Sequence, residues 1–318
     1  MGWNSEVKVD ILMATYNGEA YLAQQISSII DQDYSNWKLI IRHDGSSDAT
    51  IDIITSYMNS YPDKIVLITD EDHLGARGSF SRLLTLSRSE YVMFCDQDDI
   101  WLSHKIRVTL EKMLELEKDR PGRPLMVHSD LIVVGRNEEA IAPSFWSYQY
   151  LDPSQNSLNN LLIQNIVTGC TVMINEGLKN LVVDIPDDVI MHDWWLALIA
   201  SLSDGVFHIN EPTIMYRQHG SNSIGAQRYG IKTYFKKYGT ARQTLNKLIV
   251  QASSLQQKYI HKFNNEQSRV VKAFVELPET GKIQRLIVLN RYSIHKQGWL
   301  RKMAFCLLLL SWKKQKKQ

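Results

Sequence analysis

Short apolar segments alternate with amphipathic segments along the first hundred residues. Continuous apolar runs are typical of strands buried on both faces of a sheet. They occupy Val9–Ala14, Trp37–Ile41, Ile65–Ile68 and Tyr91–Cys95. The intervening segments have helical periodicity, over Tyr21–Ile30, Ala49–Met58 and Ser79–Leu86. This alternation indicates βαβ units and predicts an α/β domain with a mostly parallel sheet covered by helices.

The later sequence predicts fewer strands. Further strands are expected over Leu125–Val134, Gly169–Ile174 and Thr213–His219, and a helix over Met191–Ala200. Residues 143–160 are rich in Pro, Ser, Asn and Tyr and predict a surface loop. From about Arg228 the chain is basic with helical periodicity. We therefore expect a domain over residues 1–225 and a helical C-terminal region over residues 226–318.

The composition is that of a folded globular protein. Of 318 residues, 44% are hydrophobic and 22% charged, which excludes disordered, collagen-like and coiled-coil chains. The three cysteines are far apart and form no CxxC pair, so we expect no disulfide framework or structural zinc site. The N-terminus lacks the basic and apolar layout of a signal peptide, which predicts a cytoplasmic protein.

The formal net charge of +2 conceals a division between the two regions. Residues 226–318 carry a net charge of +17, whereas residues 1–225 carry −15. A basic region indicates an anionic partner. Residues 298–317 have an apolar centre between cations, with Trp299 and Trp312 at its ends, and predict an interfacial helix on an anionic membrane. The alternative is a helix packed on the domain. Nucleic acid is not expected, because no binding motif accompanies the charge.

Three polar loops follow the predicted strands. They are Thr15–Glu19, Arg42–Asp48 and Asp96–Asp99. Because ligands bind beyond the carboxyl ends of parallel strands, these loops predict one shared site. Asp96 and Asp98 have the spacing and chemistry for a divalent cation with phosphate oxygens. Asp99 is expected to cap the next helix instead.

Other polar residues have both a ligand-binding and a structural interpretation. Asp44 could accept a hydrogen bond from the N3–H group of a pyrimidine base, or it could have a structural role in a turn. Asp193 could act as a catalytic base beside sugar rings that stack on Trp194 and Trp195. Alternatively, the two tryptophans could anchor a helix in the core. Arg217 and His219 could bind a diphosphate, or they could simply belong to a polar loop.

Together these motifs resemble family 2 glycosyltransferases of the GT-A, Rossmann-like fold. The likeness rests on Ala14–Asn17, Asp44–Asp48 and Phe94–Trp101, and extends over residues 7 to about 225. More narrowly, residues 167–171, 191–198 and 216–219 resemble bacterial rhamnosyltransferases that build rhamnose-rich wall polysaccharide. Two features depart from the family. His43 replaces a common acid, and Gly75–Phe80 fits the family's glycine turn poorly.

The resemblance implies roles for residues that match the family motifs. Asp193 would be the catalytic base, and Asp98, Asp96 and His219 would hold Mn²⁺ or Mg²⁺. The donor nucleotide sugar would contact Thr15, Tyr16, Asn17, Glu19, Asp44, Arg77, Asp96, Gln97, Asp98 and Arg217. The acceptor would contact Trp194, Trp195, Thr168 and Gly169.

The expected activity is inverting transfer of L-rhamnose from dTDP-β-L-rhamnose to a lipid-linked saccharide at the inner face of the cell membrane. Another nucleotide-hexose donor, or a non-catalytic sugar-binding scaffold, remains an alternative. A homodimer is left open. A phosphatase or nucleotidyltransferase fits less well, because the sequence around Ile100 and the loop after the first strand lack the expected motifs.

Overall fold

The computed structural model describes residues 7–312 except 71, 183 and 221–230. The chain divides into two compact units. The first comprises Met1–Phe145, Val167–Ile185 and Phe207–Ala226. The second comprises Trp146–Ile166, Pro186–Val206 and Gln227–Gln318. The division differs from the predicted one in two segments, 146–166 and 186–206, which cluster with the C-terminal helices rather than with the sheet.

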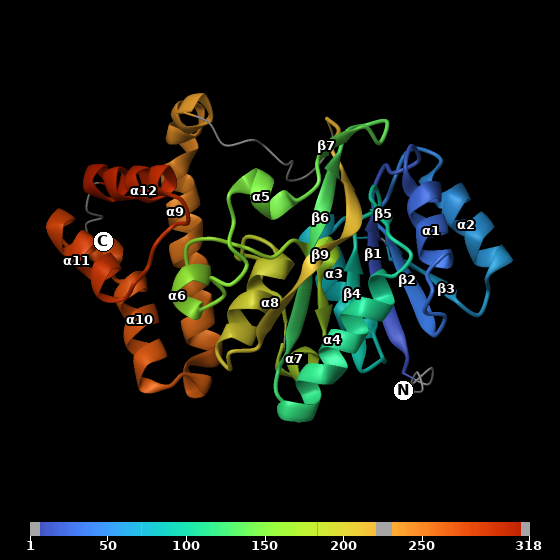
Figure 1. Ribbon diagram of the computed structural model, residues 1–318, viewed down its shortest axis with the longest axis horizontal. Coiled ribbons are helices and arrows are strands. Elements are labelled where there is room, and N and C mark those ends of the chain that lie inside the picture. The colour runs from blue at the N-terminus through green and yellow to red at the C-terminus, as the bar shows by residue number, and fades with distance from the viewer. Residues whose placement is uncertain (1–6, 71, 183, 221–230, 313–318) are drawn as a thin grey trace. The chain divides into compact units, whose positions relative to one another are not determined.

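Within its described residues the first unit is built on a nine-stranded sheet (Figure 1). The strand order is β3-β2-β1-β4-β8-β6-β9-β5, with β7 paired to β6. The strands are β1 (Val9–Thr15), β2 (Trp37–His43), β3 (Ile65–Thr69), β4 (Tyr91–Cys95), β5 (Ile100–Trp101), β6 (Met126–Val134), β7 (Ala140–Ala142), β8 (Met173–Ile174) and β9 (Val206–Arg217).

The sheet is parallel in one part and antiparallel in the other. β1 pairs in parallel with β2 and β4, and β2 with β3, which confirms the predicted βαβ units. By contrast, β8 pairs antiparallel with β4 and β6, and β5 pairs antiparallel with β9. The parallel register brings the ends of β1, β2 and β4 to one edge of the sheet.

Helices of the first unit connect these strands. They are α1 (Leu22–Ile30), α2 (Thr50–Ser60), α3 (Gly75–Leu86), α4 (Lys105–Asp119), α7 (Glu176–Leu181) and the 3₁₀ turn η1 (Gly169–Thr171). The core lies where their apolar faces cover the sheet, and β1 and β4 are almost fully buried within it. The predicted strand over Gly169–Ile174 is shorter than expected, because its first three residues form η1.

The second unit is helical. Its helices are α6 (Leu158–Leu161), α8 (His192–Ser201), α9 (Ile231–Tyr259), η2 (Ile260–Lys262), α10 (Asn265–Val275), η3 (Leu277–Glu279), α11 (Lys282–Arg291) and α12 (Trp299–Ser311), with α5 (Phe145–Gln149) at its boundary. The expected loop over residues 143–160 therefore contains α5 and the start of α6. Among the described residues no helix is long and apolar enough to cross a bilayer.

Candidate active site

The loop after β1 is fixed by hydrogen bonds to its neighbours. The Thr15 hydroxyl donates to the Arg42 carbonyl at 3.0 Å. Asn17 has a φ of +47°, a left-handed conformation that asparagine tolerates. Its amide donates to the Ser46 hydroxyl at 2.9 Å, and its side-chain oxygen accepts from the Ser47 amide at 2.9 Å. Tyr16 is left with 48% of its surface exposed, so its ring is open to a ligand.

Gln97 joins the β4 loop to the β1 loop. Its side chain accepts from the Tyr16 amide and donates to the Tyr16 carbonyl, both at 2.9 Å. A Cβ at position 18 would lie 2.4 Å from the Gln97 oxygen, so glycine permits this close approach. Glu19 extends the same network by accepting from the Ala49 amide at 2.9 Å.

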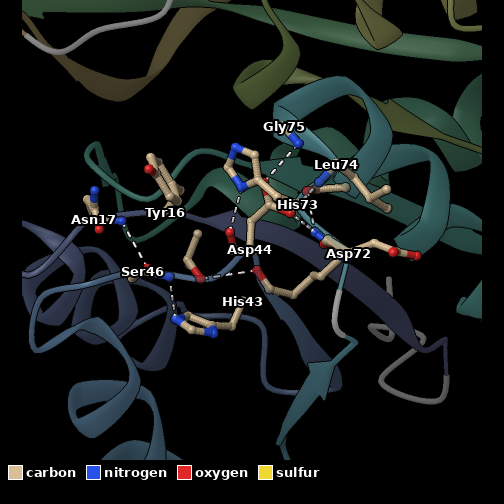
Figure 2. A network of polar contacts seen from close by, with 12 residues as sticks. Tyr16, Asn17, His43, Asp44, Ser46, Asp72, His73, Leu74 and Gly75 are labelled. Carbon is tan, nitrogen blue, oxygen red and sulfur yellow. Dashed lines mark hydrogen bonds and ion pairs between the residues drawn. The ribbon is translucent and has the colours of Figure 1, made fainter.

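Asp44, at the end of β2, anchors the start of α3 (Figure 2). Its carboxylate accepts from the amides of Leu74 and Gly75, both at 2.8 Å, and forms an ion pair with the buried Arg42. Burial raises the pKa of Asp44, but the hydrogen bonds from Arg42, Leu74 and Gly75 outweigh burial and leave the pKa below its ordinary value. The structure thus gives Asp44 a full set of protein partners.

His73 lies beside Asp44 and Tyr16 (Figure 2). Its Nδ1 is 2.8 Å from the Asp44 carbonyl oxygen, and its ring packs 4.9 Å from the Tyr16 ring. Its side chain is 61% exposed. Nearby, the His43 ring accepts from the Ser46 amide at 3.0 Å, so this histidine shapes the β2 turn.

Asp98 and His219 meet at the same edge of the sheet. The His219 Nε2 and the Asp98 Oδ2 are 2.8 Å apart, although 121 residues separate them. The Tyr21 ring packs 4.7 Å from the His219 ring and supports it. The structure therefore brings together two of the three predicted cation ligands.

Arg217, at the end of β9, donates hydrogen bonds that fix the loop containing Asp98. Its Nε donates to the Asp98 carbonyl at 3.1 Å, and its other nitrogens donate to the Arg136 carbonyl at 2.9 Å and the Gln24 side chain at 2.6 Å. Only 2% of its surface is exposed. Because the Arg217 guanidinium is buried and hydrogen-bonded to protein groups, it positions the loop rather than being exposed to a diphosphate.

Asp96 lies in a second cluster with Asp99 and Cys170. One ligand atom of each lies within 4.8 Å of the others. Asp99 is fully buried and accepts from the Arg217 amide at 3.2 Å. Burial, with the charges of Asp98 and Asp96, raises the pKa of Asp99 well above its ordinary value. The prediction that Asp99 caps α4 is wrong, because the chain first enters β5 and α4 begins only at Lys105.

The residues at this edge have donors suited to a hard divalent cation. Asp98 offers a carboxylate oxygen and His219 an imidazole nitrogen, and Asp96 lies in the same loop as Asp98. Oxygen and imidazole ligands suit Mn²⁺, and carboxylates suit Mg²⁺. Asp99 and Cys170 are buried, and burial raises the pKa of both groups. The pair Asp98 and His219 thus offers donors for a cation, whereas the structure groups Asp96 with Asp99 and Cys170.

Asp193 belongs to the second unit, in the first turn of α8. Its Oδ2 accepts from the Asn165 amide group at 3.1 Å, and its Oδ1 accepts from the Trp194 amide at 2.7 Å. Asn165 fixes its orientation.

The two predicted acceptor tryptophans differ in their surroundings. Trp194 is half-buried and donates from its indole nitrogen to the Leu161 carbonyl at 2.6 Å. Trp195 is completely buried, with its ring 5.9 Å from that of Tyr259. The prediction that Trp195 contacts a sugar is therefore wrong, because it anchors α8 in the core of the second unit.

Three other predicted residues lie in the first unit. Thr168 and Gly169 lie at the start of η1, where the Thr168 carbonyl accepts from the Thr171 hydroxyl at 2.7 Å. Arg77 is half-buried in the first turn of α3, close in sequence to the amides that bind Asp44. Their contacts with donor or acceptor remain predictions.

Comparison with known proteins identifies the family. The profile of glycosyl transferase family 2 matches residues 10–181, more than half of the chain. The chain belongs to glycosyl transferase family 2. The match includes the loops after β1, β2 and β4, so it covers Asp44, Asp96 and Asp98.

The names of two relatives of this family 2 glycosyltransferase specify nucleotide-sugar donors. It is 29% identical to the dTDP-rhamnosyl transferase RfbG of Shigella flexneri over 243 residues, which is 72% of this chain and 79% of that protein. It is 30% identical to the UDP-Glc:alpha-D-GlcNAc-diphosphoundecaprenol beta-1,3-glucosyltransferase WfgD of Escherichia coli over 173 residues, which is 54% of this chain and 62% of that protein.

Solved structures share the fold. S. aureus TarS residues 1–349 matches with a TM-score of 0.55 at 15% identity, over 90% of this chain and 73% of that one. The mannosyltransferase PcManGT of Pyrobaculum calidifontis, in complex with GDP-Man and Mn²⁺, matches with a TM-score of 0.52 at 16% identity, over 94% and 78%. The predicted GT-A fold is thereby confirmed.

Several supporting residues of the glycosyltransferase are absent from the sequence predictions. Tyr21 supports His219, Gln24 binds Arg217, and Asn165 orients Asp193. No local pattern indicates Gln24 or Asn165, because their partners lie far along the chain. The only sequence indication for Cys170 is its position directly after Thr168 and Gly169, which are predicted acceptor contacts.

Proposed function

We propose that this family 2 glycosyltransferase transfers L-rhamnose from dTDP-β-L-rhamnose to a saccharide acceptor, with inversion at the anomeric carbon. The donor assignment rests on the dTDP-rhamnosyl transferase of S. flexneri, whose similarity extends over 72% of this chain. The product would be an α-rhamnoside in a bacterial wall or capsular polysaccharide.

The observation that supports this chemistry most is the pair Asp98–His219, 2.8 Å apart at the edge of the sheet where three strand-end loops meet. Asp98, His219 and Asp96 would hold a Mn²⁺ or Mg²⁺ ion. When bound, such an ion stabilises negative charge on a leaving diphosphate. Arg217 keeps the Asp98 loop in place, and the exposed ring of Tyr16 offers a stacking face for the nucleotide base.

Asp193 is proposed as the general base. The bond between the anomeric carbon and the diphosphate oxygen breaks, and its electron pair leaves on dTDP. An acceptor hydroxyl oxygen forms the new bond from the opposite face, and its proton passes to the Asp193 carboxylate. Asn165 and the Trp194 amide hold this carboxylate in one orientation without neutralising it. A single displacement inverts the anomeric configuration.

The acceptor is proposed to be lipid-linked and the enzyme to act peripherally at the inner face of the membrane. Support comes from the basic region after residue 226 and from the E. coli relative, whose name specifies a diphosphoundecaprenol acceptor. That relative also supports the alternative of another nucleotide-hexose donor, since its donor is UDP-Glc at 30% identity.

A donor panel tests the assignment. The purified chain is incubated with Mn²⁺ and dTDP-β-L-rhamnose, UDP-glucose or GDP-mannose, and nucleotide release is measured for each. We expect dTDP-rhamnose to be consumed fastest, and proton NMR of the product to show an α-linked rhamnose. Faster consumption of UDP-glucose would identify a glucosyl donor instead. A β-rhamnoside product would refute inversion.

A further inference from the structure

Exposed apolar side chains are concentrated on two helices of the second unit. Among the described residues, 13 large hydrophobic side chains are exposed, and six of them lie on α11 and α12. On α11 these are Ile283, 74% exposed, and Ile287, 51% exposed. On α12 they are Trp299, Leu300, Met303 and Leu307, exposed by 73%, 38%, 55% and 57%.

The spacing places these residues on one face of each helix. Ile283 and Ile287 are four residues apart, as are Trp299, Met303 and Leu307 in succession. Residues four apart share a helix face. We call the five residues Ile283, Ile287, Trp299, Met303 and Leu307 the outer stripe.

The opposite faces of both helices already have partners within the unit. Val288 and Leu289 of α11 are buried, as are Phe305, Leu308 and Leu309 of α12. The buried Arg285 joins the two helices by donating to the Leu309 carbonyl at 2.8 Å and the Trp312 carbonyl at 2.6 Å. The outer stripe is therefore not needed to hold the helices together.

The charged residues of α11 and α12 are all positive. Lys282, Arg291 and Lys302 are exposed on the same helices, and no acidic residue follows Glu279 in the sequence. Apolar residues with tryptophan, surrounded by cations, are what an anionic lipid interface accommodates. A second copy of the chain fits less well, because it would bring another strongly cationic region against this one.

We propose that the outer stripe of α11 and α12 docks on an anionic lipid surface, with its five apolar side chains entering the headgroup region. This rests on the proposed function, in which the acceptor is lipid-linked. It also corrects the sequence prediction of one interfacial helix with Trp299 and Trp312 at its ends, because only 2% of Trp312 is exposed and it packs inside the unit. Lys313–Lys317 lie outside the described residues.

Vesicle sedimentation of the full chain tests the docking surface. Phosphatidylglycerol vesicles are compared with phosphatidylcholine vesicles, without nucleotide sugar. One variant carries Trp299→Gln, Met303→Gln and Leu307→Gln, and another carries Ile283→Gln and Ile287→Gln. Glutamine is chosen because it is a good helix former. The matched control is Val250→Gln with Ile260→Gln, two exposed apolar residues of α9 and η2 in the same unit.

We expect wild type and control to bind phosphatidylglycerol, and each stripe variant to bind about tenfold more weakly or worse, with unchanged circular dichroism. High salt should weaken binding of the wild type. Wild-type binding by either stripe variant, or equal binding to phosphatidylcholine, would overturn the proposal. So would a lipid-free dimer, detected by sedimentation velocity, that the stripe variants abolish.

The assay separates this proposal from the proposed function. Release of dTDP by the same proteins is measured in solution without vesicles. A chain that binds vesicles through the stripe but turns over no donor refutes the function alone. A chain that turns over dTDP-rhamnose but ignores phosphatidylglycerol refutes the docking surface alone.

Discussion

Asp98 connects the β4 loop to both Arg217 and His219. We predict that Asp98→Asn lowers dTDP release about 10²-fold or more, because the amide is a poor cation ligand, while circular dichroism stays unchanged. The matched control, Asp119→Asn at the exposed end of α4, should retain full activity. Wild-type rates for the Asp98 variant, assayed at limiting Mn²⁺, would contradict the proposed cation site.

Asp193 allows a second test at the level of one side chain. Asp193→Asn keeps the side-chain size and the acceptor for the Trp194 amide but removes the base. Transfer should fall about 10²- to 10⁴-fold, while dTDP affinity, measured by calorimetry, stays the same. Asp204→Asn is the control, because its φ of +52° suits asparagine. A loss of dTDP affinity that matches the loss of rate would show that Asp193 binds the donor instead.

The junction between β2 and α3 depends on Asp44. Because the pKa of Asp44 is lowered in the fold, its contribution to stability is complete above the ordinary pKa of an aspartate and is lost as the pH falls through the folded value. Asp44→Asn removes one of the two carboxylates that pair with the buried Arg42, and Asp70 remains at 2.6 Å. We predict a loss of about 2 kcal/mol in the free energy of unfolding at pH 7, because a charged hydrogen bond at a buried group is lost.

That loss should begin to shrink below about pH 4, where the aspartate becomes protonated in the unfolded chain, and should disappear once the pH has fallen through the lower folded pKa. Urea unfolding of wild type and variant at pH 7 and pH 3.5 measures it. Asp63→Asn, an exposed carboxylate before β3, should change neither value. An Asp44 variant as stable as wild type at pH 7 would show that the ion pair contributes nothing to this junction.

The elements that the sequence predicts best are those specified by local pattern. β1 to β4 and the helices between them follow from apolar runs and periodicity, and their strand-end loops do converge on one edge. Elements fixed by distant partners are not predictable in this way. Ile100 enters a strand because it pairs with Met215, and this pairing displaces Asp99 from the expected cap.

Burial was equally hard to predict from residue type. Trp194 and Trp195 are the same residue one position apart on α8, yet Trp195 faces the core and Trp194 is half-buried. The same holds at the two ends of α12, where Trp299 is exposed and Trp312, the residue after the helix, is buried. Which face of a helix finds a partner depends on segments far along the chain.

At the scale of the whole molecule, the residues proposed for the reaction come from two units. Asp98 and His219 belong to the sheet unit, and Asp193 belongs to the helical unit, together with the outer stripe. The segment 186–206 carries Asp193 into the helical unit. The proposed cation ligands thus lie in the sheet unit, and the proposed base and the outer stripe lie in the helical unit.

We propose above that the sheet unit activates a rhamnosyl donor through a divalent cation. The most direct measurement is the rate of dTDP release from dTDP-β-L-rhamnose by the full chain with Mn²⁺, after excess EDTA, and after Mn²⁺ is restored. We expect EDTA to abolish release and restored Mn²⁺ to return the original rate, in wild type but not in Asp98→Asn. Undiminished release in EDTA would contradict it.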